Sequence, residues 1–205
     1  NDGKKIAYVS FEGKNSSVFI QDISTGNRTQ VSKFSGINSS PNWSPDDSHL
    51  ALTLSKDGNT EIYTMNLLTK SLKRITQNNG IDTEPIWSPD GKKLAFTSDR
   101  SGSPQIYEVA IKNGKAKRLS FEGAYNARPR YSPDGKFITL VHSTGGSYHI
   151  ALLNLTSGYI NVLTDGPLDE SPSFAPNGSM VIYATTGRRG GQLAAISVDG
   201  RIKQR

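Results

Sequence analysis

The amino-acid sequence predicts an all-β fold, a β-propeller built from four-stranded antiparallel blades, on three observations. A proline-centred segment recurs four times, at Pro41, Pro85, Pro129 and Pro172, with spacings of 44, 44 and 43 residues. The chain has 20 Gly and 10 Pro among 205 residues, which is typical of short strands joined by tight turns. Apolar residues follow no 3.6-residue period, which argues against helical repeats of similar length.

The plan of one repeat is clearest in the second of these segments. Ile86-Trp87 forms a short strand, and Ser88-Pro89-Asp90-Gly91 is a turn in which proline presets φ and aspartate suits the next position. The apolar run Leu94–Thr97 forms the second strand. Gln105–Val109 alternates with period two as the third strand, and Lys117–Leu119 supplies the fourth. Each repeat therefore predicts four antiparallel strands.

Such a sheet cannot bury both faces alone, so the units are expected to stack face to face around an axis. The aromatic series at one position of the repeat then belongs to the core between blades; its members are Trp43, Trp87, Tyr131 and Phe174. The first seven residues match residues 89–95, so the first unit is expected to lack its first strand. Nineteen strands are expected in all.

We expect one incomplete propeller domain over residues 1–205, belonging to a longer parent protein. Its repeat units run approximately over residues 1–35, 38–80, 82–124, 126–167 and 169–205. Neither end supplies the missing inner strand that a propeller ring commonly borrows from the other terminus.

Composition excludes several classes of function. The net charge is +6, but Lys and Arg are spread over the chain, without the basic stripe and stacking aromatics of nucleic-acid sites. The densest basic pair, Arg188-Arg189, is interpreted as a loop tip. No segment has the length of apolar sequence that a membrane span needs, so no direct membrane insertion is expected. The absence of cysteine excludes disulfides and thiolate metal sites.

Two longer stretches, residues 79–100 and 168–183, closely resemble the C-terminal propeller of the TolB family, and the similarity extends over essentially the whole chain. The resemblance implies a six-bladed propeller in the complete parent, with about five blades present here. It also implies the periplasm of a Gram-negative bacterium and binding to the lipoprotein Pal, in the Tol-Pal complex that supports outer-membrane integrity and cell division. The resemblance further implies that some colicins use the same face. Contact with TolA belongs to a separate N-terminal domain and is not expected here.

Residues just before each repeat proline should form a ring at the mouth of the central channel. Three positions before the proline stand Asn38, Asp82, Asn126 and Asp169; two before, Ser39, Thr83, Ala127 and Glu170; one before, Ser40, Glu84, Arg128 and Ser171. The resemblance assigns Pal contact to Ser40, Thr83 and Glu84, and also to Asp169 and Glu170. Ile37 departs from the polar residue that some relatives carry. Local turn capping by the Asp and Asn side chains is the alternative interpretation.

A second hypothesis concerns a cation in the channel. Asp82 and Asp169, with Asn38 and Asn126, offer the oxygen ligands that Ca²⁺ prefers. No other cofactor is expected.

The rival class is an enzyme. A prolyl-oligopeptidase or tricorn-type hydrolase uses a propeller to filter substrates, but the Gly-x-Ser-x-Gly of a nucleophile elbow does not occur in the sequence. His49, His142 and His149 fall in or beside strands of different units, without a His-Glu-x-x-His motif. A weaker alternative is a sialidase-like propeller, because residues 55–60 partly resemble an Asp box. We therefore expect a non-catalytic binding module.

Overall fold

The computed structural model describes residues 2–112, 114–187 and 190–204. Residue 1 and the predicted loop tip at Arg188-Arg189 lie outside the described residues. Five sheets follow one another along the chain, beginning with a three-stranded sheet of β1 (Lys5–Ser10), β2 (Ser17–Asp22) and β3 (Arg28–Ser32).

Four four-stranded sheets come next, each with its strands in chain order. They are β4 (Asn38–Trp43), β5 (His49–Leu54), β6 (Glu61–Asn66) and β7 (Leu72–Arg74); β8 (Asp82–Trp87), β9 (Lys93–Ser98), β10 (Gln105–Ala110) and β11 (Ala116–Arg118); β12 (Tyr125–Tyr131), β13 (Phe137–Gly145), β14 (Ser147–Asn154) and β15 (Ile160–Val162); and β16 (Asp169–Phe174), β17 (Met180–Gly187), β18 (Gly190–Ser197) and β19 (Lys203–Gln204).

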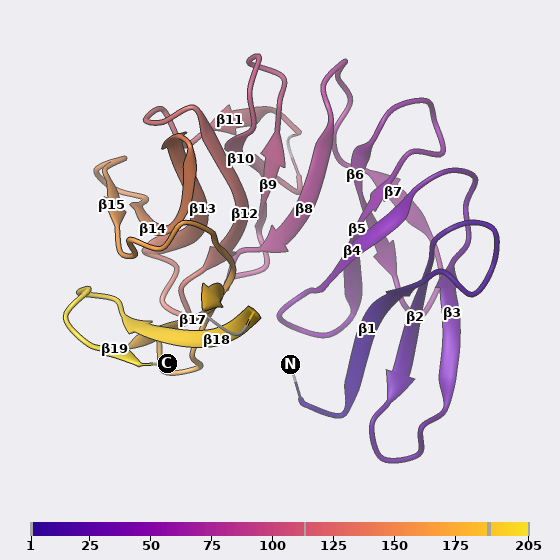
Figure 1. Ribbon diagram of the computed structural model, residues 1–205. Coiled ribbons are helices and arrows are strands. Elements are labelled where there is room, and N and C mark those ends of the chain that lie inside the picture. The colour runs from indigo at the N-terminus through magenta and orange to yellow at the C-terminus, as the bar shows by residue number, and fades with distance from the viewer. Residues whose placement is uncertain (1, 113, 188–189, 205) are drawn as a thin grey trace.

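The predicted fold class is confirmed. The described residues form 19 strands, every sheet is antiparallel throughout, and the sheets stand as blades around a common centre (Figure 1). The first blade lacks the strand that the other four place innermost, as the sequence predicts. No helix with the length and hydropathy of a membrane span occurs in the described ranges.

The Ser-Pro-Asp-Gly turn joins the first and second strands of a blade and shows why these residues recur. In the third blade, Gly91 N donates to Ser88 O at 2.9 Å, while Asp90 Oδ1 accepts from Ser88 Oγ at 2.6 Å and from Lys92 N at 3.1 Å. Gly91 has φ of +69°, a conformation that glycine adopts without steric cost. The turn therefore reverses the chain and satisfies its own polar groups.

The core lies between neighbouring blades rather than within any one of them. Trp87 of β8 packs with Ile62 of the preceding blade and with Leu94 and Phe96 of its own. Trp43, Tyr131 and Phe174 pack in the same way against three other buried clusters. The prediction that this aromatic series forms the inter-blade core is confirmed. Burial of these faces is the main favourable term that holds the blades together.

Candidate functional site

Each innermost strand carries a β-bulge at the residue before its repeat proline. The register between strands one and two shifts there in all four complete blades. The bulged residue has positive φ each time; the four are Ser40 (49°), Glu84 (57°), Arg128 (56°) and Ser171 (56°). Proline lacks an N–H for the sheet ladder and is tolerated inside a sheet at such bulges. The bulge turns the side chain before the proline away from the ladder.

These bulges surround a hollow of about 400 Å³ at the centre of the propeller. Its lining comes from the innermost strands of four blades; it consists of Ser40, Pro41, Asn42, Glu84, Pro85, Arg128, Arg130, Ser171, Pro172 and Ser173. The residues one position before the proline therefore come together as the predicted ring. Arg130, one position after a proline, also reaches the hollow and was not part of the sequence prediction.

Charged side chains link three blades across this hollow. Arg128 Nη1 donates to Glu170 Oε2 at 2.6 Å and to Ser171 Oγ at 2.7 Å, while Arg128 Nε lies 3.4 Å from Glu84 Oε1. All three charged side chains keep partial exposure, so each ion pair contributes little to stability. Their effect is to place two carboxylates and a guanidinium at fixed positions on the channel wall.

Threonines of the second strands anchor two of the bulges. Glu84 N donates to Thr53 Oγ1 at 3.2 Å, and Arg128 N donates to Thr97 Oγ1 at 3.1 Å. Glu84 Oε2 accepts from both Thr97 Oγ1 and Arg128 N. In three of these four bonds the donor and the acceptor come from adjacent blades, so inter-blade contacts hold the strained backbone at the ring.

Burial lowers the pKa of Arg130, and Glu84 partly offsets this effect while Arg128 adds to it. A guanidinium stays protonated at any physiological pH even so. Arg130 Nη1 donates to Pro129 O at 2.8 Å. The channel wall therefore holds two positive charges as well as two negative ones.

The residues three positions before the proline have a different place from the one expected. All four are almost entirely buried, with exposed fractions of 0 to 1%; they are Asn38, Asp82, Asn126 and Asp169. Each bonds to the loop that leads into its own strand. Asn38 Nδ2 donates to Phe34 O at 2.7 Å, and Asp169 Oδ2 accepts from Gly166 N at 3.1 Å. These side chains shape the loops around the channel and offer no exposed surface of their own.

The same bonds bear on the calcium hypothesis. Asp82 Oδ2 accepts from Arg100 at 2.6 Å and from Asn78 at 2.8 Å, so this oxygen is already engaged, whereas Oδ1 has no hydrogen-bond partner among the described residues. Asn126 is likewise committed to the carbonyl of Glu122 and to the His142 imidazole. Within the described residues, no group of three or more His, Cys, Asp or Glu side chains could hold a metal ion. These bonds disfavour a cation at the four predicted ligands, and the calcium site stays a prediction.

Two positions before the proline, the predicted residues are partly accessible. Ser39, Thr83 and Glu170 are half-buried, whereas Ala127 is buried. Their role in partner binding stays a prediction.

Sequence reasoning missed a ring of apolar residues four positions before each proline. Ile37, Ile81 and Leu168 are exposed by 47%, 52% and 42%, and Tyr125 is half-buried. Tyr148, 37% exposed, packs edge-on against Tyr125 with ring centroids 5.2 Å apart. The signal was present in the sequence, because an apolar residue recurs at this offset in all four repeats. Alternation explains the exposure, because the residue that follows each of them is buried and successive side chains point to opposite sides.

Comparison with known proteins places this geometry in a family. The family described as PD40, the TolB beta propeller domain, matches residues 1–205. A protein of Alcanivorax borkumensis named Tol-Pal system protein TolB is 74% identical over 203 residues, covering 98% of this chain and 47% of that protein. The protein of the same name from Nitrosococcus oceani is 66% identical, covering 100% of this chain and 47% of its own length. The chain thus spans about half the length of these curated relatives.

Solved structures agree. The crystal structure of TolB from Acinetobacter baumannii superposes with a TM-score of 0.92 at 51% identity, covering 98% of this chain and 51% of that one. An oligogalacturonate lyase in complex with manganese also matches, with a TM-score of 0.73 over 99% of this chain and 62% of its own. At 17% identity the likeness to that enzyme concerns the fold alone.

Proposed function

This chain belongs to the TolB beta propeller family, and from that premise we propose that it is a non-catalytic binding module that docks the lipoprotein Pal on its channel-mouth face. We define that face as the apolar ring Ile37, Ile81, Tyr125 and Leu168 together with the polar ring Ser40, Glu84, Arg128 and Ser171. The relatives at 74% and 66% identity carry the name Tol-Pal system protein, which supports a partner within that system.

The apolar ring is the observation that carries the proposal. Exposed aliphatic side chains at the same offset in three blades surround a polar centre, and isolated surface hydrophobics would not be expected to repeat in this way. Protein interfaces commonly combine such apolar groups with charges that fix orientation. Here Arg128, Glu84 and Glu170 supply those charges, and their contacts to one another hold them in place before a partner arrives.

The family resemblance extends the proposal to the cell. It implies the periplasm of a Gram-negative bacterium, and a role in outer-membrane integrity and cell division through the Tol-Pal complex. Colicins would compete for the same face. The contact with TolA would belong to a separate domain and not to these blades.

Isothermal titration of the periplasmic domain of Pal into the full-length protein tests the proposal. Ile81→Arg places a charge in the apolar ring and is expected to weaken binding by about tenfold or more. Leu68→Arg is the matched control, because Leu68 is 91% exposed on the β6–β7 turn and lies outside the rings. It is expected to leave the affinity unchanged.

Thr83→Arg provides a second variant at a half-buried position next to the apolar ring, and it should weaken binding as well. A folded wild-type protein that gives no heat with Pal would refute the proposal. Equal losses in Ile81→Arg and Leu68→Arg would refute the assignment to this face.

A further inference from the structure

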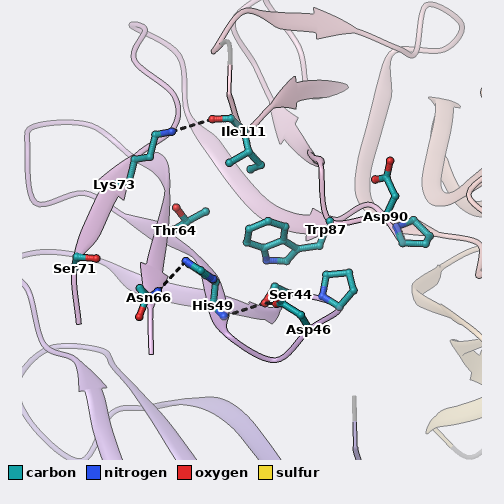
Figure 2. A pocket seen from close by; sticks show the side chains of 13 residues that line it. Ser44, Asp46, His49, Thr64, Asn66, Ser71, Lys73, Trp87, Asp90 and Ile111 are labelled. Atoms are coloured by element: carbon teal, nitrogen blue, oxygen red, sulfur yellow. Dashed lines mark hydrogen bonds between the residues drawn. The ribbon is translucent and has the colours of Figure 1, made fainter. Parts of the chain in front are cut away.

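A pocket of about 500 Å³ lies between the second and third blades, at the end of the strands where the Ser-Pro-Asp turns stand. Its walls come from β5, β6, β7 and β8, and the turns at Pro45 and Pro89 form its rim. Figure 2 shows the Trp87 indole in the middle of this pocket, with His49 on one side and Asp90 on the other. The channel-mouth face is at the opposite end of the same strands, so this pocket is separate from the proposed Pal site.

The indole N–H of Trp87 is a buried donor without a hydrogen-bond partner among the described residues. Trp87 is only 8% exposed. The neighbouring polar side chains are already engaged: His49 Nδ1 lies 2.6 Å from Ser48 Oγ, His49 Nε2 lies 3.3 Å from Asn66 Nδ2, and Lys73 Nζ donates to Ile111 O at 2.9 Å. An indole nitrogen can only donate, so an acceptor must come from elsewhere.

The next inter-blade groove provides an internal comparison. Tyr131 holds the position of Trp87 one repeat later, and its hydroxyl donates to Glu108 Oε1 at 2.7 Å. Lys93 Nζ donates to the other oxygen of that carboxylate at 2.9 Å. The Tyr131 hydroxyl in that groove is therefore satisfied from inside the protein. Thr64 occupies the place of Glu108 beside Trp87 and brings no carboxylate to the indole. The pocket beside Trp87 measures about 500 Å³, against about 380 Å³ in the groove that Glu108 and Tyr131 line.

The charges and walls restrict what can enter. Asp46 and Asp90 stand at the rim, and hydrogen bonds from Ser44 and Ser48 lower the pKa of Asp46 to about 2, so it is ionised at neutral pH. Hydrogen bonds from Ser88 and Lys92 N lower the pKa of Asp90 as well. Two carboxylates disfavour an anionic ligand and favour a neutral acceptor with a cationic neighbour.

The apolar part of the wall is formed mainly by rings. It consists of the Trp87 ring, Pro45, Pro89 and Ile111. Aromatic and proline surfaces with one indole donor suit an extended proline-containing peptide, because polyproline II segments expose their carbonyls and lose little entropy on binding.

We propose that this pocket binds a short extended peptide in which a proline packs on Trp87, a backbone carbonyl accepts from its indole N–H, and a basic residue faces Asp46 and Asp90. The pocket volume falls in the range of specific small-ligand sites. The site is thus a second recognition surface, independent of the channel mouth.

Titration of the full-length protein, labelled with ¹⁵N at its tryptophan indoles, tests this site. The probe is acetyl-Pro-Pro-Arg-Pro-amide, and Trp87→Phe identifies the resonance. A saturable shift of the Trp87 N–H signal is expected, together with weaker binding of acetyl-Pro-Pro-Glu-Pro-amide. No shift up to the solubility limit of the arginine peptide would overturn the proposal, and so would equal binding of both peptides.

Two variants separate a binding role from a structural one. Thr64→Glu places in this pocket the carboxylate that Glu108 supplies in the next groove, so it should engage the indole and weaken peptide binding by about tenfold. Tyr131→Phe alters only the neighbouring groove and should leave the peptide affinity unchanged. Undiminished binding by a folded Thr64→Glu protein would show that the indole donor is not used, and would overturn the assignment.

Discussion

The buried ion pair beneath the channel-mouth face allows a prediction with a defined magnitude, using the change Arg100→Met. The side chain of Asp82 is 0% exposed and that of Arg100 is 23% exposed. Arg100 Nη2 donates to Asp82 Oδ2 at 2.6 Å, and the guanidinium lies 4.8 Å from the centroid of the Tyr107 ring. Methionine keeps much of the apolar contact with that ring and removes the charge.

Loss of one partner from a buried pair leaves an uncompensated charge, which typically costs about 3 to 5 kcal/mol. Asn78 Nδ2 still donates to Asp82 at 2.8 Å, and Arg100 is partly exposed, so the lower end applies. We expect Arg100→Met to reduce the free energy of unfolding by about 3 kcal/mol at pH 7. Adding Asp82→Asn removes the stranded charge and should recover about 2 kcal/mol of that loss.

The loss should depend on pH in a defined direction. Burial raises the pKa of Asp82, against the opposing effects of Ser98 and Arg100. A carboxyl whose folded pKa is raised contributes most below its unfolded pKa of about 3.9, and that contribution is lost as pH rises through the folded pKa. Removing Arg100 raises the folded pKa further. The deficit of Arg100→Met should therefore shrink as pH falls from 7 to 5.

Urea unfolding followed by far-ultraviolet circular dichroism, at both pH values, measures these differences. A loss below about 1 kcal/mol for Arg100→Met would refute the argument, because it would mean that Asp82 does not depend on its partner. A double variant no more stable than the single variant would refute it as well. The Asp82 loop also presents Ile81, so the same variant should weaken the proposed docking of Pal.

Two further predictions concern other buried groups. Glu61 is fully buried, and Gln105 occupies its place one repeat later. Glu61→Gln should therefore lower the free energy of unfolding by about 1 kcal/mol, and Glu61→Ala by about 3 kcal/mol, as measured by urea unfolding. Equal losses for the two variants would contradict this prediction. Burial lowers the pKa of His142, with a further contribution from His149. Its neutral form is favoured by folding, so stability present above about pH 6.5 is lost as pH falls through the lowered pKa. His142→Gln should thus lose less thermal stability than the wild type between pH 7 and 5, and an equal loss would assign the acid sensitivity to other groups.

Much of the fold could be predicted because its signals are local. The Ser-Pro-Asp-Gly turn forms its hydrogen bonds within six residues, and the strands follow from alternation over short windows. Because the signals recur in every repeat, the number of strands and the incomplete first blade could be predicted from the sequence. The inter-blade position of Trp87 and its equivalents followed from the inability of one sheet to bury both faces.

The site was predicted only in part. The ring of Ser40, Glu84, Arg128 and Ser171 comes together as expected. The residues three positions before each proline, which were also expected at the channel mouth, are buried. Alternation along the strand points these side chains into the protein. The bulge before the proline then shifts the register, so the residues that follow it face the opposite side from the one that simple alternation predicts. The ion pairs that join Arg128 to Glu84 and Glu170 cross 42 to 44 residues of sequence, which no local pattern reports.

What the sequence alone determined is the architecture: a repeat of about 44 residues, four strands per repeat and stacking around an axis, since these depend on period and turn chemistry. Only the tertiary structure decided which polar groups are paired. Glu108 satisfies Tyr131, whereas no described residue accepts from Trp87, although both aromatics occupy the same position of the repeat. The physical reason is that a hydrogen bond depends on atoms within about 3 Å, contributed here by strands that only the packed blades bring together.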